Sequence, residues 1–384
     1  MTLYGHIFLM KGLVFLLYGV MIFYCTVCPV DRAWSKEADY DRILLDPIVV
    51  SPGRSPVPSS RIAGQVEVFT AEDLHGLPAR NLAEALNYMP GVDIQNNGPF
   101  GQATAVSIRG SNSRQVLVMV DGIPFNTQLS GQANLSRIPL ENVAQVEVIK
   151  GGDSSAWGSS LGGVINVITK PPGTGPKPHG RLTTSFAQFA AAKNSLELDG
   201  KAGAAGYSAF GSFLHADGHL ADSRTQEIKN FTKVKYDFNP STDISASFGY
   251  SGAQLRYGPT NAGRIFDQPY ISRYGAVELK TDTMEHRVST AYKYNDQDIT
   301  TDTYNSSTGA RVSSTVSHNF YQGLSFNDVY EWHSDRTLTM GMDFDWHALK
   351  SSNYLTKAQG QCAVALCQFG LGGGGLGFYS GAAL

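Results

Sequence analysis

The chain has 384 residues, a formal net charge of −3 and only 16% charged residues. This length accommodates two domains, and a nearly balanced charge provides no electrostatic field that would recruit nucleic acid. Aromatic residues reach 11%, and glycine occurs 41 times. A chain that is low in charge but rich in glycine, tyrosine and phenylalanine differs from an ordinary soluble enzyme and favours a β-barrel membrane protein.

The N-terminus has the features of an export signal. Lys11 precedes an apolar segment, residues 12–30 carry no charge, and Ala33 and Ser35 provide small residues for cleavage. We therefore predict a signal peptide over residues 1–35, with more than one acceptable cut site. An uncleaved transmembrane anchor is the alternative, because the apolar run approaches the roughly 20 residues that span a bilayer.

Residues 36–60 form a polar, proline-rich linker that opposes both helix and central strand. One extended, β-prone segment interrupts this linker, and its members are Asp46, Pro47, Ile48, Val49, Val50 and Ser51. A strand on a flexible tether can be captured by the sheet edge of another protein. The alternative is an ordinary first strand of the domain that follows.

Residues 61–172 predict a compact α+β domain. Thr70 followed by Asp73 predicts one helix start, and Asn81 precedes apolar residues at helical spacing before Pro90. The expected strands cover residues 92–94, 105–108 and 116–120, followed by the turn Asp121–Gly122. Two further apolar strands, around Val146 and Val164, flank a loop rich in glycine and serine.

Residues 178–384 predict part of a transmembrane antiparallel β-barrel. Strands of about ten residues alternate in polarity, as expected where one face meets lipid and the other a wet lumen. Short connections are expected at 204–205, 239–241, 295–298 and 333–336, and long ones at 217–228, 254–282 and 351–375. This predicts ten strands, from Gly180 to a tenth that begins at Leu376. A soluble sandwich is the alternative.

Ten strands are too few to enclose a domain of this size. Eight strands are nearly filled by their own side chains, and plugged transporters use about 22. We therefore expect the chain to be truncated at its C-terminus.

Several motifs occur in the order that characterises one family. They are Pro90-Gly91-Val92-Asp93-Ile94, Ser107-Ile108-Arg109-Gly110, Val116 to Asn126, and the stretch 146–170 that ends in Gly-Gly-Val-Ile-Asn-Val-Ile-Thr-Lys. The chain resembles the TonB-dependent outer-membrane receptors, most closely the cobalamin receptor subfamily. The resemblance implies an α+β plug domain inside an outer-membrane barrel, a TonB box at 46–51, and the TonB energy-coupling protein as partner.

The implied function is active import of cobalamin or a related corrinoid. A ferric siderophore or haem receptor is an alternative that differs only in its ligand. A passive pore and a non-functional fragment are alternatives of another class.

The resemblance assigns ligand contact to two plug loops, through Asn97, Phe100 and Gln102, and through Thr127, Gln128, Ser130 and Gln132. Their amide and hydroxyl groups suit the amide-rich rim of a corrinoid better than an anionic iron chelate. The alternative is that both loops are simple turns.

Charged residues carry two further predictions. Arg109, Glu147 and Lys150 are predicted to pair the plug with the barrel wall, with a salt bridge inside the plug as the alternative. Asp217 and Asp222 are predicted to bind calcium, the only metal that the resemblance implies, although loop carboxylates are usually solvated.

No arrangement of residues predicts catalysis. The histidines are scattered, and no Ser-His-Asp or metal-ligand spacing stands out. We therefore expect neither an enzyme nor an organic cofactor. Cys362 and Cys367 can pair after export or remain free thiols.

Overall fold

The computed structural model describes residues 48–49, 57–58, 65–96, 104–151, 160–218, 222–333, 336–356 and 362–383, all within one compact unit that begins at Asp46. The predicted signal peptide, residues 1–35, lies outside these ranges. None of the described helices is long and apolar enough to cross a membrane.

Residues 65–169 form a small α+β domain, which we call the plug domain. Its elements are β3 (Gln65–Thr70), α2 (Ala71–Gly76), α3 (Leu82–Leu86), β4 (Val92–Asn96), β5 (Thr104–Ile108), the 3₁₀ helices η2 (Ser113–Gln115), η3 (Leu135–Arg137) and η4 (Leu140–Asn142), β6 (Val116–Val120), β7 (Ile123–Pro124), β8 (Val143–Lys150) and β9 (Gly163–Thr169). Five strands form a sheet in the order β3-β8-β9-β6-β7, in which only the β6–β9 pair is parallel. Strands β4 and β5 form a separate antiparallel pair.

The predicted helix starts are confirmed. The side chain of Thr70 accepts a hydrogen bond from the Asp73 amide, and Asp73 Oδ2 accepts one from the Thr70 amide at 2.9 Å, which completes a capping box. Asn81 Oδ1 caps α3 by accepting from the Glu84 amide at 3.0 Å. These caps satisfy amides that a helix of five or six residues leaves without a partner.

Three backbone positions with positive φ explain one predicted turn and the start of one strand. Asp121 and Gly122 have φ values of 48° and 74°, so the Asp-Gly pair makes the left-handed turn between β6 and β7. Gly163 has a φ of 139°, and a Cβ added there would lie 2.4 Å from the Ile149 carbonyl oxygen. Glycine is therefore required where β9 begins beside β8.

The plug domain has its own apolar core. Its fully buried members come from both helices and from the central strands, and they include Leu82, Leu86, Val116, Val118, Val120, Leu135, Val146, Val148, Ile165 and Val167. Each such side chain contributes about 1.5–3 kcal/mol on burial. The domain thus has an interior of the kind that an independent globular domain has.

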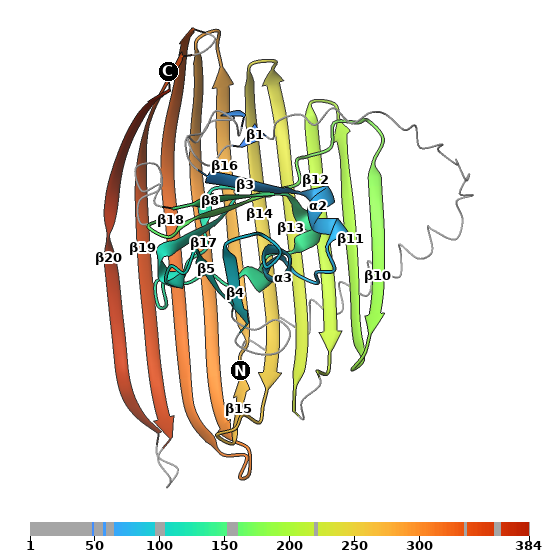
Figure 1. Cartoon of the computed structure of the whole chain (residues 1–384), viewed down its shortest axis with the longest axis vertical. Helices are drawn as coiled ribbons and strands as arrows, with labels where there is room; N and C mark the ends of the chain where they lie inside the picture. Colours follow the sequence, from blue (N-terminus) through green and yellow to red (C-terminus); the bar gives the residue numbers. More distant parts are fainter. Residues whose placement is uncertain are drawn as a thin grey trace, which may run out of the picture. The chain divides into compact units, whose positions relative to one another are not determined.

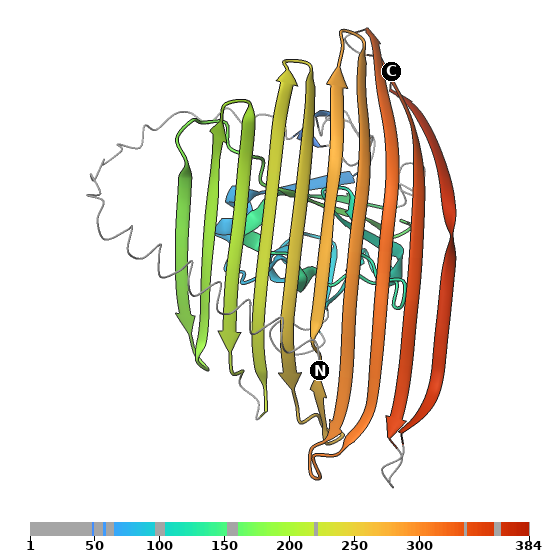
Figure 2. The same ribbon diagram turned by 180° about the vertical axis from the view of Figure 1, so that it is seen from behind.

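Residues 179–383 form an antiparallel sheet of 11 strands, which we call the wall. Its strands are β10 (His179–Ala187), β11 (Ala191–Ala202), β12 (Ala205–Ala216), β13 (Arg224–Asn239), β14 (Thr242–Tyr257), β15 (Arg264–Asp267), β16 (Tyr270–Asp282), β17 (His286–Asn305), β18 (Arg311–His333), β19 (Arg336–Thr356) and β20 (Cys362–Ala383). The plug elements lie against one face of this sheet (Figures 1 and 2).

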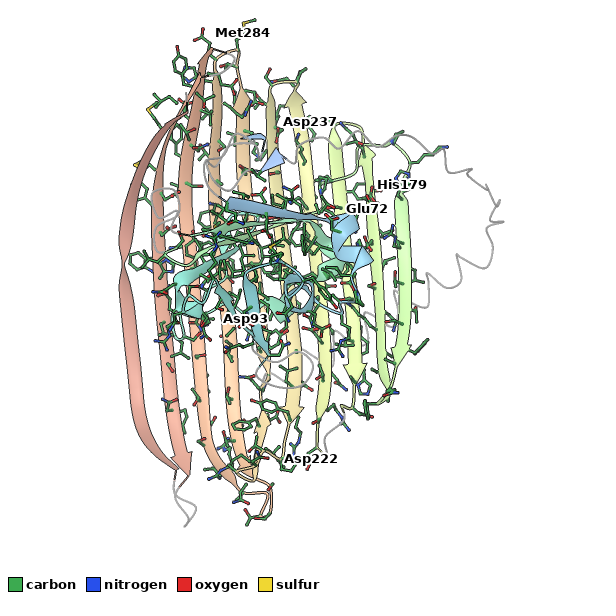
Figure 3. The ribbon with its side chains drawn as sticks, in the orientation of Figure 1. Glu72, Asp93, His179, Asp222, Asp237 and Met284 are labelled. Atoms are coloured by element: carbon green, nitrogen blue, oxygen red, sulfur yellow. The ribbon has the colours of Figure 1, made fainter. Side chains whose placement is uncertain are left out.

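Connections at the two ends of the wall differ in length, as predicted. Strands β11 and β12, and β13 and β14, are joined by very short turns. At the other end β12 stops at Ala216 and β13 begins at Arg224, and residues 306–310 join β17 to β18, although residues 188–190 alone join β10 to β11 there. Met284 in a short turn and Asp222 in a longer connection lie at opposite ends of the wall (Figure 3). Outer loops of such barrels are the longer ones, so the Asp222 end corresponds to the outside.

The predicted turn at residues 295–298 is wrong. These residues lie inside β17, where polar side chains bind the plug: Asn295 Nδ2 donates to the Pro124 carbonyl at 2.7 Å and Gln297 Nε2 to the Phe125 carbonyl at 3.2 Å. A polar run therefore continues as a strand because its polar groups have partners. The predicted long loops at 254–282 and 351–375 are also wrong. Most of the first forms β15 and β16, and in the second residues 351–356 belong to β19 and residues 362–375 to β20.

The predicted strand count and length need two further corrections. Ten of the 11 strands have nine or more residues, and β15 has four. The predicted count of ten equals the number of long strands only by accident, because the prediction omits β16 and divides β17 into two strands. The tenth strand was expected from Leu376, but β20 begins at Cys362. Strands reach 23 residues in β18, and a membrane needs about 9–11, so the wall extends well beyond a bilayer.

The two faces of the wall differ in chemistry. On the outer side, large apolar residues are exposed and form what we call the outer belt: Val234, Phe248, Val277, Leu279, Tyr292, Leu324, Phe326, Met340, Phe344 and Trp346. On the opposite side, Phe210, Phe231, Tyr274 and Tyr321 are buried with the plug core. This alternation confirms the predicted barrel pattern.

Candidate functional site: plug loops and the plug–wall interface

The predicted ligand loop at residues 127–132 is a closed turn. The Thr127 amide donates to the Gln132 carbonyl at 2.9 Å, and the Gly131 amide donates to the Thr127 carbonyl at 2.8 Å. The hydroxyls of Thr127 and Ser130 lie 2.7 Å apart, and Gln132 Nε2 donates to Ser113 Oγ at 2.6 Å. Three of the four predicted residues therefore use their polar groups within the plug.

The tip of this loop reaches the wall. Gln128 Nε2 lies 2.9 Å from His347 Nδ1 of β19, and the Leu129 amide donates to Asn319 Oδ1 of β18 at 3.3 Å. Gln128 and Leu129 are both exposed. The tip thus presents an amide and an apolar side chain beside the wall, and it remains a predicted ligand contact.

The other predicted loop cannot be compared in this way. Asn97, Phe100 and Gln102 lie outside the described residues.

A cavity of about 920 Å³ separates part of the plug from strands β10 to β12. Its lining combines apolar groups such as Leu74 and Phe186 with charged ones such as Glu84, Arg181 and Lys193. The plug therefore does not fill the space on this side of the wall.

Lysines on the plug-facing side of the wall make the principal ionic contacts with the plug. Lys193 of β11 pairs with Glu141, and Lys233 of β13 pairs with Asp121 at 2.9 Å. Lys233 Nζ also donates to Thr169 Oγ1 at 2.7 Å. These contacts join the wall to three separate segments of the plug.

A fourth contact surrounds Arg137, which is buried in η3. Its Nη1 donates to Gln297 Oε1 of β17 at 3.0 Å, and its guanidinium lies 4.2 Å from the ring centroid of Tyr270. Burial lowers the pKa of Arg137, although Tyr270 and Glu227 act in the opposite direction. An arginine side chain is not deprotonated in proteins, so these wall partners hold a buried cation.

The wall partners of Arg137 continue into a chain of hydrogen bonds. Tyr270 donates from its hydroxyl to Glu227 Oε1 at 2.6 Å, and Lys229 pairs with the same carboxylate at 3.1 Å. Lys229 Nζ then donates to the Ser136 carbonyl of the plug at 2.7 Å. Glu227 and Lys229 are 6% and 8% exposed, so this chain is largely shielded from water.

Glu141 is a second titratable plug group at this interface whose pKa is shifted. Burial by itself would raise the pKa of Glu141, but the Lys193 ammonium outweighs that effect and lowers it. The carboxylate therefore stays charged at neutral pH and keeps its ion pair with the wall.

One aromatic contact accompanies these polar ones. Phe125, just after β7, meets Tyr274 of β16 edge-to-face with ring centroids 4.8 Å apart. Phe125 is 3% exposed and Tyr274 is also buried. This pair belongs to an apolar contact in which Phe210, Phe231 and Tyr321 of the wall are also buried with the plug core. Hydrogen bonds and ion pairs surround that contact.

The predicted plug–wall residues behave differently from this set. Lys150 Nζ pairs with Glu67 Oε1 at 2.5 Å and also donates to the Pro90 carbonyl, so its ion pair lies inside the plug, as the alternative reading held. Glu147 is fully buried on β8 and accepts from Gln145 Nε2 at 2.8 Å. Arg109 is exposed, has a φ of 52° and forms no ion pair with another described residue.

Sequence reasoning missed the lysines that do join the wall to the plug. Lys229 and Lys233 lie four positions apart on β13, so both point to the same side, opposite to Val234 of the outer belt. A lysine pair on the polar face of a predicted barrel strand is the signal that could have found them.

Of the predicted TonB box, the structure describes Ile48 and Val49. They form β1 (Ile48–Val49), which pairs antiparallel with β2 (Val57–Pro58), and Val49 is fully buried. Asp46, Pro47, Val50 and Ser51 lie outside the described residues. The central residues of the box are thus held by a strand of the same chain, in a sheet separate from that of the plug.

The predicted calcium ligands are not brought into a group. Asp217 lies 3.5 Å from His215 Nε2 and 3.6 Å from Arg224 Nε, so its neighbours are basic groups. Among the residues that the structure describes, the group whose possible ligand atoms lie within 4.8 Å of one another is instead Asp296, Asp298 and His318. Calcium at Asp217 and Asp222 stays a prediction.

The comparisons with known proteins agree with this architecture. Residues 58–164 match the family model of the TonB-dependent Receptor Plug Domain. The described plug domain is therefore similar to the plug of the TonB-dependent receptors, and the wall beside it resembles a stretch of a receptor barrel.

A curated relative has similarity across both domains. The vitamin B12 transporter BtuB of Photobacterium profundum is 27% identical over 325 residues, which cover 78% of this chain and 52% of the transporter. The chain thus spans about half the length of that relative.

Solved structures show the same fold at low identity. The ferripyoverdine receptor of Pseudomonas aeruginosa has a TM-score of 0.68 and 13% identity, covering 88% of this chain and 51% of the receptor. The copper transporter OprC has a TM-score of 0.66 and 18% identity, covering 79% and 49% of the two chains. At these identities the likeness concerns the fold alone.

Proposed function

We propose that this chain belongs to a receptor that imports cobalamin, or a related corrinoid, across the outer membrane with energy supplied through TonB. The observation that carries the proposal is the similarity to a vitamin B12 transporter over 325 residues that include both plug and wall. Transport, rather than catalysis, is the activity we propose.

The plug–wall interface supports a transport mechanism. The Lys193–Glu141 and Lys233–Asp121 pairs and the Arg137–Gln297 hydrogen bond are polar contacts that water can replace when the plug moves. The plug core, in contrast, is apolar and has no such replacement. The plug can therefore separate from the wall at a lower free-energy cost than its own unfolding requires.

Neutral groups at the plug loop support a corrinoid as ligand. Gln128 is exposed at the loop tip, and Thr127, Ser130 and Gln132 add only hydroxyl and amide groups around it. We propose that this tip contacts the amide side chains of a corrinoid. An anionic iron chelate would require cationic groups at the same place.

We further propose that residues 46–51 bind TonB as an added β-strand. Strand β1 already pairs with β2 through Ile48 and Val49, which supports a strand-forming segment here. A strand of the partner would take the place of β2, so that main-chain hydrogen bonds hold residues 46–51 to TonB.

The test is uptake of radiolabelled cyanocobalamin by cells whose only corrinoid receptor is the full-length protein. Val49→Pro removes a backbone donor from the proposed strand, and we expect TonB-dependent uptake to fall at least about tenfold, the effect of losing about 1.4 kcal/mol or more of binding. Val49→Leu keeps that donor and serves as the matched control. Unchanged uptake by the proline variant would refute the coupling proposal.

The same cells distinguish the ligand class. If cyanocobalamin is not bound but growth in iron-poor medium depends on the receptor, the ligand is an iron chelate and the corrinoid proposal is wrong.

A further inference from the structure

A compact charged cluster lies on the outer side of the wall, away from the plug. Asn295 and Gln297 of β17 donate to plug carbonyls, so the alternate residues Asp296 and Asp298 point outward. His318 of the neighbouring β18 faces Asp298 in the strand register, and Arg273 of β16 faces Asp296. The cluster therefore draws on three adjacent strands and plays no part in holding the plug.

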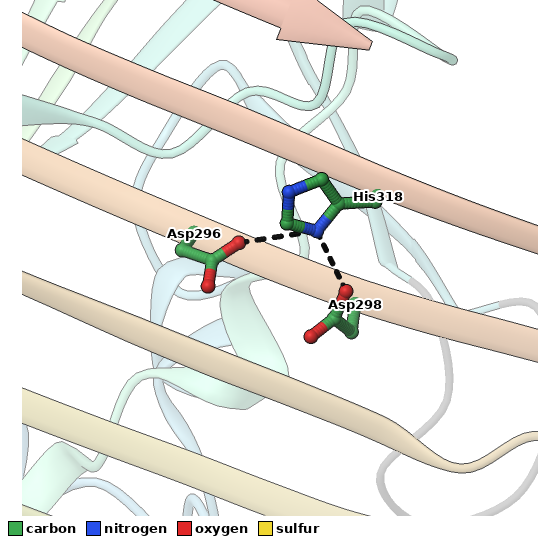
Figure 4. Close-up of side chains that lie close together, drawn as sticks. All are labelled: Asp296, Asp298 and His318. Carbon is green, nitrogen blue, oxygen red and sulfur yellow. Dashed lines mark hydrogen bonds and ion pairs between the residues drawn. The ribbon is translucent and has the colours of Figure 1, made fainter. Parts of the chain in front are cut away.

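The two carboxylates divide their oxygens in the same way. Each Oδ2 accepts from Arg273 Nη1, at 3.0 Å for Asp296 and 3.3 Å for Asp298. Each Oδ1 points to His318 Nδ1, at 3.3 Å for Asp296 and 2.7 Å for Asp298 (Figure 4). Arg273 thus orients both carboxylates and leaves one oxygen of each aimed at the same imidazole nitrogen.

One of these oxygens lacks a hydrogen bond. Asp296 is 7% exposed, and its Oδ1 is buried without a hydrogen-bond partner among the described residues. A buried carboxylate oxygen in this state carries a desolvation cost, which a cation in contact with it would offset. The neighbouring cationic group is His318, whose Nδ1 lies 3.3 Å from this oxygen, and a metal ion between the two atoms would take over that contact.

We propose that Asp296 Oδ1, Asp298 Oδ1 and His318 Nδ1 bind a divalent transition-metal ion of the zinc class. The three ligand atoms lie within 4.8 Å of one another, and metal bonds of about 2.0–2.2 Å can reach all three after small side-chain shifts. The ion takes the place of a proton on His318 Nδ1, and Arg273 acts as a positioning residue through the outer carboxylate oxygens.

The ligand set selects the class of ion. Calcium takes six to eight oxygen ligands, whereas this group offers two carboxylate oxygens and one imidazole nitrogen. Three protein ligands leave a fourth position for water, and the half-exposed side chains of His318 and Asp298 keep that position open to solvent.

The consequence for the wall is a cross-link between β17 and β18. The cluster adjoins the edge-to-face pair Tyr294–Phe320, whose ring centroids are 5.6 Å apart. An aromatic pair followed by charged groups is the order found where a barrel leaves the apolar part of a membrane. The ion would stabilise the wall at that boundary.

The experiment measures binding of Zn²⁺, Ca²⁺ and Mg²⁺ by calorimetry to the protein purified from outer membranes in detergent and freed of metal by chelation. We expect saturable Zn²⁺ binding, with no comparable binding of Ca²⁺ or Mg²⁺. Cobalt(II) in place of zinc should give the visible absorption bands of a low-coordinate site.

His318→Ala should weaken Zn²⁺ binding by about tenfold or more. The matched control is His286→Ala, because His286 Nδ1 lies 3.0 Å from Asp328 Oδ2 in a pair with a single carboxylate, and its loss should leave Zn²⁺ binding unchanged. Asp298→Asn, which keeps the size of the side chain, gives a second variant whose folding is checked by heat-modifiable migration.

Equal Zn²⁺ affinity in the parent protein and in the folded His318 and Asp298 variants would overturn the proposal. Absence of Zn²⁺ binding to the parent would do so as well, and the cluster would then be an ion-paired network only.

Discussion

The interior of the plug and its interface with the wall are built from different interactions. Inside the plug, Val118, Val146 and Ile165 are fully buried among other aliphatic side chains. At the interface, Phe125 and its aromatic neighbours form one apolar contact, and the surrounding contacts are ion pairs and hydrogen bonds from wall lysines, Arg137 and Gln297. The fold of the plug is therefore stabilised by apolar burial, whereas its attachment to the wall depends largely on polar contacts that water can replace.

This difference separates the stability of the plug fold from the strength of its attachment to the wall. A single large core would make the two depend on each other. Apolar burial stabilises a domain in proportion to its buried area and has no substitute in water. A charged hydrogen bond contributes about 1.5–3 kcal/mol, and water can take over either partner once the contact opens. The plug can therefore change its position without losing its fold.

The largest effect is expected from a cavity inside the plug. Ile165→Ala, in the central strand β9, should lower the free energy of unfolding of the plug by about 2–5 kcal/mol. Limited proteolysis of the plug across a urea titration measures this. Ile168→Ala on the same strand is the control, because Ile168 is only partly buried and should cost clearly less. Equal costs would contradict a core centred on Ile165.

A smaller effect is expected at the interface. Lys229→Met leaves Glu227 with Tyr270 as its remaining donor and removes the bond to Ser136, so attachment of the plug should weaken by about 1.5–3 kcal/mol. The measurement is the urea concentration at which protease first reaches the plug–wall interface.

Lys235→Met provides the matched control for this change. Lys235 lies on the same strand but pairs with Asp237 and Asp243 of the wall. Its replacement should leave attachment of the plug unchanged, and if both variants release the plug equally, the assignment of Lys229 to the interface is wrong.

The smallest effect is expected from mild acid. The pKa of Glu141 is lowered in the folded protein, so its stabilising contribution is fully present above the unfolded value of about 4.3 and is lost as pH falls through the folded value. Attachment of the plug should therefore weaken below about pH 4.3. Protease sensitivity against pH measures this, and Glu141→Gln should remove that part of the pH dependence.

The plug was the part of the fold that its sequence predicted well. Local signals coincide there with the final structure: Thr70 and Asp73 make the predicted capping box, and Asp121–Gly122 makes the predicted turn. In these places neighbouring residues determine the backbone, so a sequence pattern is sufficient.

The wall and the site were predicted less well because their partners are distant in the chain. Asn295 and Gln297 resemble turn residues until Pro124 and Phe125 are placed opposite them. Lys233 likewise acquires its role only when β13 lies beside Asp121. The identity of a partner more than one hundred positions away cannot be predicted from the neighbouring sequence, even where the spacing of Lys229 and Lys233 places both side chains on the polar face of a strand.

The position of β3 at the edge of the plug sheet has a mechanical consequence. Of the plug strands, β3 follows most directly from the N-terminal linker, and within the sheet it is bonded to β8 alone, over the register from Gln65↔Lys150 to Thr70↔Gln145. Tension applied through the linker loads this single ladder before it reaches the doubly bonded strands β8 and β9. The Lys150–Glu67 ion pair crosses that ladder near its loaded end, so it reinforces the first pair of strands that a pulling force would separate.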